Sequence, residues 1–138
     1  MKKLVEKLGY RTGIGTQVWQ CPDDIAPMLM PILEHQSETP SFRIGFAIDQ
    51  ADLSRLANEF ASSYERGGHL WICYPKKSGG IVTDLTRDVG WEPVYALDLF
   101  GVAQVSVDAT WSALRFRKRD EITSFTRKTR TGGPSPQQ

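Results

Sequence analysis

The chain has 138 residues, of which 40% are hydrophobic and 24% are charged, and its formal net charge at pH 7 is +1. This length is sufficient for one domain that buries its own core, so folding requires neither disulfides nor a structural metal. No run of about 18 apolar residues is present, which excludes a predicted membrane-spanning helix and a membrane partner. Cys21 and Cys73 lie in apolar, strand-like runs without a Cys-x-x-Cys or Cys/His cluster beside them. That pattern is typical of free thiols in a cytoplasmic protein.

Positive charge is concentrated near the end of the chain. Between Arg115 and Arg130 there are seven Lys and Arg residues but only two acidic residues. Residues 121–138 offer little apolar surface to bury, which predicts a single domain over residues 1–120 and a basic, disordered tail over residues 121–138. Few aromatic residues are interleaved with these charges, and this argues against a platform for nucleic acid.

The first predicted strand covers residues 16–21 and ends at Pro22. Asp23 can cap a helix after this strand, and apolar residues then recur at helical spacing. Pro27 and Pro31 fall inside that helix, and proline removes a backbone donor. The helix is therefore expected to be short or kinked.

A strand–helix–strand unit is predicted next. Residues 42–48 form a predicted strand, and Asp49 can cap a helix over residues 50–65 that ends near Gly67-Gly68. The apolar face of this helix is formed by Leu53, Leu56, Ala57, Phe60 and Tyr64. Residues 70–74 are continuously apolar, as expected for a parallel strand at the centre of a sheet.

The second half of the chain predicts one more helix and a hairpin. Apolar residues at helical spacing predict a helix over residues 81–89, interrupted by Gly90 and Pro93 before a second turn. Residues 102–107 and 114–117 alternate in character, as in an antiparallel hairpin with one solvated face. The predicted fold is α/β, a three-layer Rossmann-like sandwich with a mostly parallel sheet and a C-terminal antiparallel hairpin.

Two segments carry a family resemblance, LWICYPKKSGGIVTDLTRD over residues 70–88 and VDATWSALRF over residues 107–116. They resemble an uncharacterised bacterial family that is known only as a domain of unknown function. The predicted order of elements also resembles a shortened class I methyltransferase fold. The resemblance covers residues 8–118 and implies a Rossmann-like fold, but it implies no particular chemistry.

The pattern departs from that of methyltransferases where the cofactor would bind. Class I methyltransferases place S-adenosylmethionine against a glycine-rich turn after the first strand, where glycine allows close approach. This sequence has Cys21-Pro22-Asp23-Asp24 at that place, and Gly13-Ile14-Gly15 precedes the strand. S-adenosylmethionine therefore remains an alternative cofactor, and no other cofactor is identified.

The leading candidate site follows the central predicted strand. In open parallel sheets ligands bind beyond the carboxyl ends of the strands, so residues 21–24, Asp49 and residues 75–80 should face one crevice. Two lysines, a hydroxyl and two glycines at a helix start suit a phosphate or carboxylate. In the alternative interpretation, Ser78 or Thr83 merely caps the helix and both lysines stay in water. The predicted ligand-binding residues are Lys76, Lys77, Ser78, Gly79, Gly80, Thr83, Asp84, Arg87, Asp108, Trp111 and Ser112.

The hairpin supplies the last part of that set. Asp108 could pair with Arg87 or Arg115, and Trp111 could cover the edge of a pocket. The alternative is turn chemistry, in which the Asp108 side chain accepts backbone hydrogen bonds. His35 and His69 lack partners at metal-binding spacing, so neither a metal site nor a catalytic residue is predicted.

The sequence thus predicts a noncatalytic domain that binds a small anionic ligand, or a partner, at the loop from Lys76 to Asp84. One alternative is a divergent S-adenosylmethionine-dependent methyltransferase. Another is an interaction protein that forms a homodimer and uses its basic tail.

Overall fold

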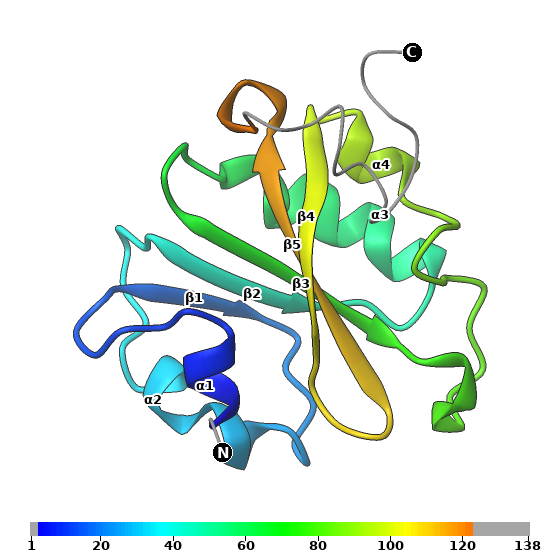
Figure 1. The fold of residues 1–138 in the computed structure, drawn as a ribbon, viewed down its shortest axis with the longest axis horizontal. Coiled ribbons are helices and arrows are strands. Elements are labelled where there is room, and N and C mark those ends of the chain that lie inside the picture. Colours follow the sequence, from blue (N-terminus) through cyan, green and yellow to red (C-terminus); the bar gives the residue numbers. More distant parts are fainter. Residues whose placement is uncertain (1–2, 123–138) are drawn as a thin grey trace.

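One five-stranded sheet organises the computed structural model, which describes residues 3–122 (Figure 1). Its strands are β1 (Thr16–Trp19), β2 (Phe42–Phe46), β3 (His69–Pro75), β4 (Leu99–Ser106) and β5 (Trp111–Lys118). They lie in the order β1-β2-β3-β5-β4, so β3 is the central strand, as its continuous apolar run predicts.

The sheet is mixed rather than mostly parallel. β1 pairs with β2 and β2 with β3 in parallel, whereas β3 pairs with β5 and β5 with β4 in antiparallel. The hairpin formed by β4 and β5 therefore continues the main sheet, because its second strand docks directly on β3. The predicted three-layer Rossmann-like sandwich with a mostly parallel sheet is wrong. The protein is a small α/β domain with few helices.

The helices are short, and proline marks the start of two of them. α3 (Gln50–Glu59) has ten residues, whereas α1 (Leu4–Lys7), α2 (Met30–Leu33) and α4 (Glu92–Tyr95) have four each. Pro31 and Pro93 lie in the first turns of α2 and α4, where a missing N–H is tolerated. In the described residues no helix has the length and apolar character needed to cross a membrane.

α3 forms where the sequence predicts it but ends early. Asp49 caps it, because its Oδ1 accepts a hydrogen bond from the Asp52 N–H at 2.9 Å. All five residues of the predicted apolar face are buried. The helix ends at Glu59 rather than near residue 65, and a 3₁₀ turn over Ala61–Ser63 follows. Gly67, predicted at the helix end, instead adopts φ +89° in the loop that enters β3.

The helix predicted over residues 81–89 does not form. The Thr83 Oγ1 accepts from the Leu85 N–H at 3.0 Å, and the Thr86 Oγ1 accepts from the Asp88 N–H at 3.3 Å. Such local side-chain bonds compete with helical hydrogen bonds. Leu85 is fully buried, but Val82 is 94% exposed, so the apolar spacing of this segment does not describe one buried face.

A hydrophobic core lies on each face of the sheet. α3 and α4 cover one face, where Leu56, Phe60 and Trp91 pack against the sheet, and α1 and α2 cover the other (Figure 1). Two buried tryptophans fix neighbouring loops through their indole N–H groups. Trp71 donates to the Leu8 carbonyl at 2.8 Å, and Trp91 donates to the Thr86 carbonyl at 2.7 Å.

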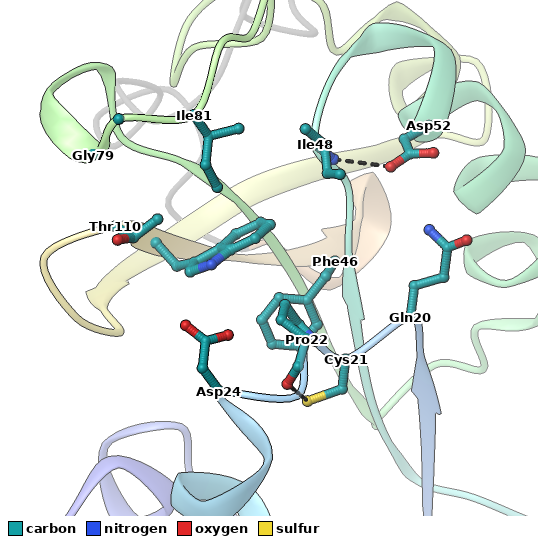
Figure 2. A pocket seen from close by; sticks show the side chains of 12 residues that line it. Gln20, Cys21, Pro22, Asp24, Phe46, Ile48, Asp52, Gly79, Ile81 and Thr110 are labelled. Atoms are coloured by element: carbon teal, nitrogen blue, oxygen red, sulfur yellow. Dashed lines mark hydrogen bonds between the residues drawn. The ribbon is translucent and has the colours of Figure 1, made fainter.

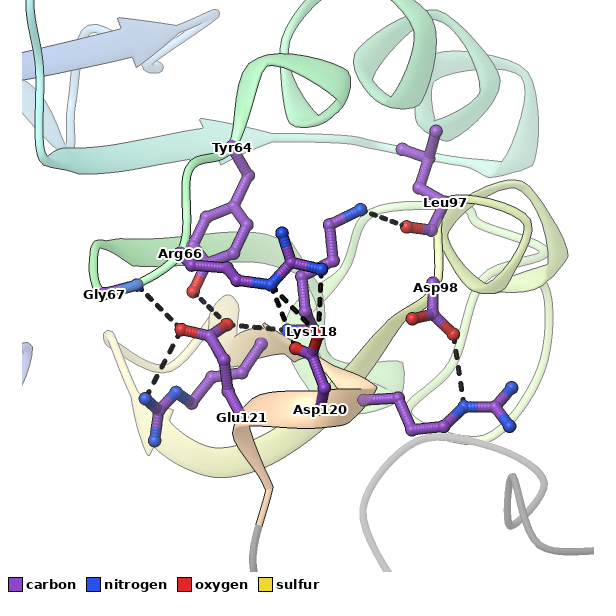
Figure 3. Close-up of polar contacts among 10 residues, drawn as sticks. Tyr64, Arg66, Gly67, Leu97, Asp98, Lys118, Asp120 and Glu121 are labelled. Carbon is purple, nitrogen blue, oxygen red and sulfur yellow. Dashed lines mark hydrogen bonds and ion pairs between the residues drawn. The ribbon is translucent and has the colours of Figure 1, made fainter.

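Polar contacts close the end of the sheet where β3 begins (Figure 3). The Glu121 Oε1 accepts from the Tyr64 hydroxyl at 2.6 Å and from the Lys118 N–H at 2.9 Å, while its Oε2 accepts from the Gly67 N–H at 2.7 Å. Burial, and then the bond to Glu121, raise the pKa of Tyr64 to about 12, so the phenol remains a donor. Glu121 is thus part of the folded domain, and the rest of the predicted tail lies outside the described residues except for Ile122.

Candidate functional site

The larger of two candidate cavities lies where β1 and β2 end (Figure 2). It has a volume of about 830 Å³, within the range of small-molecule sites. Cys21, Pro22 and Asp24 border it from the loop after β1, and Gly79 and Gly80 border it from the loop after β3. The chain therefore brings these two predicted segments together. Asp49, expected in the same crevice, is instead the N-cap of α3.

The walls of the larger cavity are mainly apolar. Pro22, Phe46, Ile48, Ile81 and Trp111 contribute to them. The Phe46 and Trp111 rings pack edge to face, with their centroids 5.3 Å apart, and both side chains are almost completely buried. Ile48 is 45% exposed, so part of this apolar surface remains in contact with water.

Asp24 and Asp52 are the charged side chains among the described residues that line this cavity. Asp52 has structural partners, because it accepts from the Ile48 N–H at 3.1 Å and pairs with Arg55. Asp24 is exposed and points into the cavity in Figure 2. The larger cavity therefore has an excess of negative charge.

The Cys21 thiol at this cavity is not an activated nucleophile. Burial, and then the charges of Asp23 and Asp24, raise its pKa to about 11. The thiol therefore keeps its proton at neutral pH, whereas nucleophilic cysteines are thiolates. Cys73 is completely buried, and that burial also raises its pKa.

The smaller cavity lies on the other side of the loop that follows β3. It has a volume of about 490 Å³ and lies between residues 76–78 and residues 86–88. Tyr74, Gln104 and Ser112, from three neighbouring strands, border it on the side of the sheet. These strands place polar side chains under a charged rim.

The floor of the smaller cavity can donate hydrogen bonds. The Gln104 Nε2 donates to the Tyr74 hydroxyl at 3.2 Å and to the Ser112 Oγ at 3.1 Å. Because the Tyr74 hydroxyl oxygen accepts hydrogen bonds here, the Tyr74 O–H remains available for donation. Tyr74 and Ser112 are only 4% and 3% exposed, and burial raises the pKa of Tyr74, so its phenol is protonated at neutral pH.

The rim of the smaller cavity is positive. Lys76, Lys77 and Arg87 line it together with a single carboxylate, Asp88. The Lys76 Nζ donates to the Ser106 Oγ at 2.7 Å, which restrains this side chain. Arg87 pairs with Asp88 at 3.3 Å, and Lys77 is exposed. The side chains of this rim carry more positive than negative charge.

The structure divides the predicted ligand-binding residues into three groups. The smaller cavity receives Lys76, Lys77, Ser78, Arg87 and Ser112, whereas the larger cavity receives Gly79, Gly80 and Trp111. The remaining three, Thr83, Asp84 and Asp108, bond to backbone groups.

Two of these three residues organise neighbouring segments. The Asp84 Oδ1 accepts from the Gln50 N–H at 2.8 Å, which joins its loop to the start of α3. The Asp108 Oδ1 accepts from the N–H groups of Thr110 and Trp111, each at 2.8 Å. The turn interpretation of Asp108 is therefore confirmed, and no ion pair of Asp108 with Arg87 or Arg115 forms within residues 3–122.

One part of the anion-site prediction is also wrong. The sequence suggests that Gly79-Gly80 begins a helix whose dipole favours anions. Instead a 3₁₀ turn covers Lys77–Gly79, Gly80 adopts φ +87°, and the chain continues without a helix. Any attraction for an anion must come from side chains and not from a helix terminus.

Several residues that line the cavities were not predicted from the sequence. Phe46, Ile48 and Ile81 in the larger cavity looked like ordinary core positions. Tyr74 in the smaller cavity lies in an apolar run, whose pattern hides its hydroxyl. Gln104 carried a usable signal, because it and Ser106 are polar residues two apart in a strand and therefore share one face.

Neither histidine belongs to these cavities. The His35 Nδ1 lies 2.8 Å from the Pro31 carbonyl oxygen, and the His69 ring stacks on Phe42. Burial, and then nearby arginines, lower the pKa of His69 to about 4. Across residues 3–122 no group of three or more His, Cys, Asp or Glu side chains is arranged to hold a metal ion.

No protein-family model, curated protein or solved structure matches this chain. The resemblance to an uncharacterised bacterial family therefore stays a prediction. The shape and charge of the two cavities are the features of this chain that bear on its function.

Proposed function

We propose that this protein binds a small anionic ligand, such as a phosphate or carboxylate compound, in the smaller cavity. The observation that carries the proposal is a positive rim, formed by Lys76, Lys77 and Arg87, above a buried floor that can donate hydrogen bonds. Charge-assisted hydrogen bonds to phosphate or carboxylate oxygens are stronger than neutral ones. The volume of about 490 Å³ is suitable for a small metabolite.

Binding is proposed without a catalytic step. Tyr74 and Ser112 retain their protons at neutral pH and can donate, but neither is activated as a base or nucleophile by a neighbouring histidine. Fewer of the predicted residues are therefore proposed to contact the ligand. Lys76, Lys77, Ser78, Arg87 and Ser112 are the proposed contacts, whereas Thr83, Asp84 and Asp108 are proposed to maintain the loops.

Two other functions remain as alternative proposals. A methyltransferase would need to hold S-adenosylmethionine, yet the loop after β1, residues 20–24, contains no glycine and does not fit close approach of that cofactor. Stabilisation against heat by S-adenosylmethionine would favour the methyltransferase. A dimer that forms with increasing concentration, without any ligand effect, would favour an interaction protein. We also propose a cytoplasmic location, which the two free cysteines support.

The proposal is tested by titrating the protein with pyrophosphate and recording backbone amide spectra by NMR. Shifts are expected at residues 76–78, 86–88 and 112. Lys77→Gln should weaken binding about fivefold, because one partly solvated ion pair contributes about 1 kcal/mol. Lys7→Gln removes an exposed lysine from α1 and is the matched control, which should bind like the wild type.

Two results would contradict the proposal. One is the absence of shifts around the smaller cavity at tens of millimolar pyrophosphate. The other is equal weakening by Lys77→Gln and Lys7→Gln, because that result would indicate a response to net charge alone.

A further inference from the structure

We infer that the larger cavity is a second ligand site, which binds an organic cation with an aromatic or apolar body. The cavity is large enough to hold a small organic molecule. Its volume of about 830 Å³ exceeds that of the smaller cavity, about 490 Å³, and is similar to the volumes of sites that enclose a small metabolite. The inference does not depend on anion binding in the smaller cavity, because the residues that line the two cavities are different.

The walls define the body of the ligand. Phe46 and Trp111 form a rigid aromatic corner, since both rings are buried and packed edge to face. Ile81 and Pro22 add apolar surface, and Ile48 leaves 45% of its surface exposed beside them. A flat apolar group would cover the exposed parts of Pro22, Ile48 and Ile81, and burial of apolar area is favourable.

The carboxylates define the charge of the ligand. Asp52 is bound by Arg55 and by the Ile48 N–H, so its charge is largely compensated. Asp24 points into the cavity from the loop after β1 (Figure 2). An ammonium group is therefore the charge that Asp24 can pair with in this cavity.

The loop after β3 separates the two sites by charge. Lys76, Lys77 and Ser78 face the smaller cavity, whereas Gly79 and Gly80 face the larger one. The two glycines bring no charge to the larger cavity, because they carry no side chain. An anion and a cation are therefore sorted to opposite sides of a single loop.

The test uses three probes that share an indole ring and differ in charge, namely tryptamine, tryptophol and indole-3-acetate. Binding to the full chain is measured by NMR titration. Tryptamine should bind about fivefold more tightly than neutral tryptophol, as expected for one partly solvated ion pair. Indole-3-acetate should bind the larger cavity most weakly. The shifts with tryptamine should centre on Phe46, Ile81 and Trp111.

Two variants assign the charge preference to one carboxylate. Asp24→Asn should lower tryptamine affinity to that of tryptophol and leave tryptophol affinity unchanged. Asp23→Asn is the matched control, because Asp23 is an exposed neighbour that does not line the cavity, and it should keep the wild-type preference. The inference would be overturned by equal affinity for the three probes, by an Asp24→Asn variant that retains the preference, or by no shift at the larger cavity at several millimolar tryptamine.

Discussion

The two ends of β3 differ in how their polar groups are satisfied. At its beginning, Tyr64, Gly67 and Lys118 all direct hydrogen bonds to one carboxylate, Glu121 (Figure 3). Beyond its end, Lys77 and Asp24 lie at the margins of two cavities. A buried polar group is costly without a partner, whereas a charge at an open cavity is free to bind a ligand. The comparison teaches that the contacts of Glu121 stabilise the fold at one end of β3, although buried Arg43 nitrogens there have no hydrogen-bond partner among the described residues. At the other end, charged side chains border open cavities.

The largest effect is expected from removing the carboxylate at the closed end. Glu121→Ala should lower the free energy of unfolding by about 2–3 kcal/mol, because it leaves the buried Tyr64 hydroxyl and two backbone N–H groups without this acceptor. Urea unfolding measures the loss. Asp120→Asn is the control, since its Arg66 partner is 61% exposed, and it should cost clearly less. If both variants lower the free energy of unfolding equally, Glu121 has no special role in stabilising this end of β3.

A somewhat smaller effect is expected from pH at the same end. Burial, followed by the charges of Arg115, Arg117 and Arg11, lowers the pKa of His69 from 6.5 to about 4. Between about pH 6.5 and pH 4, His69 is therefore protonated in the unfolded chain and neutral in the folded chain. This contribution to stability is complete above pH 6.5 and is lost as the pH falls toward 4, by at most about 2 kcal/mol for a half-buried group.

Urea unfolding at pH 7 and pH 5 tests this dependence on His69. His69→Gln should make stability less sensitive to pH over this range. His35→Gln leaves His69 in place and should retain the wild-type dependence. If His69→Gln does not change the slope, the assignment to this histidine is wrong.

The smallest change in stability is expected at the open end, together with the broadest change in binding. A Cβ at residue 79 would lie 2.8 Å from the Thr110 carbonyl oxygen and 2.9 Å from its Cα, so Gly79→Ala must shift the loop. We expect a loss of about 1–2 kcal/mol by urea unfolding. Binding of both pyrophosphate and tryptamine should weaken. Lys77→Gln and Asp24→Asn, in contrast, should each affect only one probe. Unchanged binding of both probes by Gly79→Ala would contradict the inference that the loop after β3 borders both cavities.

The unit from β2 to β3 was predictable because its signals are local. Asp49 at the start of α3 and the helical spacing of Leu53, Leu56 and Phe60 all describe interactions within one helix and the sheet below it. The docking of β5 beside β3 was not predictable in this way. An alternating pattern identifies a hairpin, but it does not specify which of its two strands meets the rest of the sheet.

The position of the candidate site was predictable from the sequence, but its local backbone structure and its division into two cavities were not. The rule that ligands bind at the carboxyl ends of parallel strands correctly brought Cys21 and Gly79 to one cavity. The supposed helix after Gly80 failed, because its threonine side chains bond locally and its apolar residues do not share a buried face. The separation into two cavities of opposite charge depends on residues distant in the sequence, such as Asp24 and Gln104, which no local pattern connects.

The bond between Asp84 and Gln50 has a consequence for the kinetics and entropy of ligand binding. It fixes the start of the segment from residue 84 to residue 91, and the fully buried Trp91 side chain fixes its end. The Trp91 indole also donates to the Thr86 carbonyl, which ties down the turn that carries Arg87. A wall tied at both ends is preorganised, so little conformational freedom remains to be lost when a ligand enters. An anion should therefore associate rapidly and without a slow closing step, and even a modest set of charges can give measurable affinity.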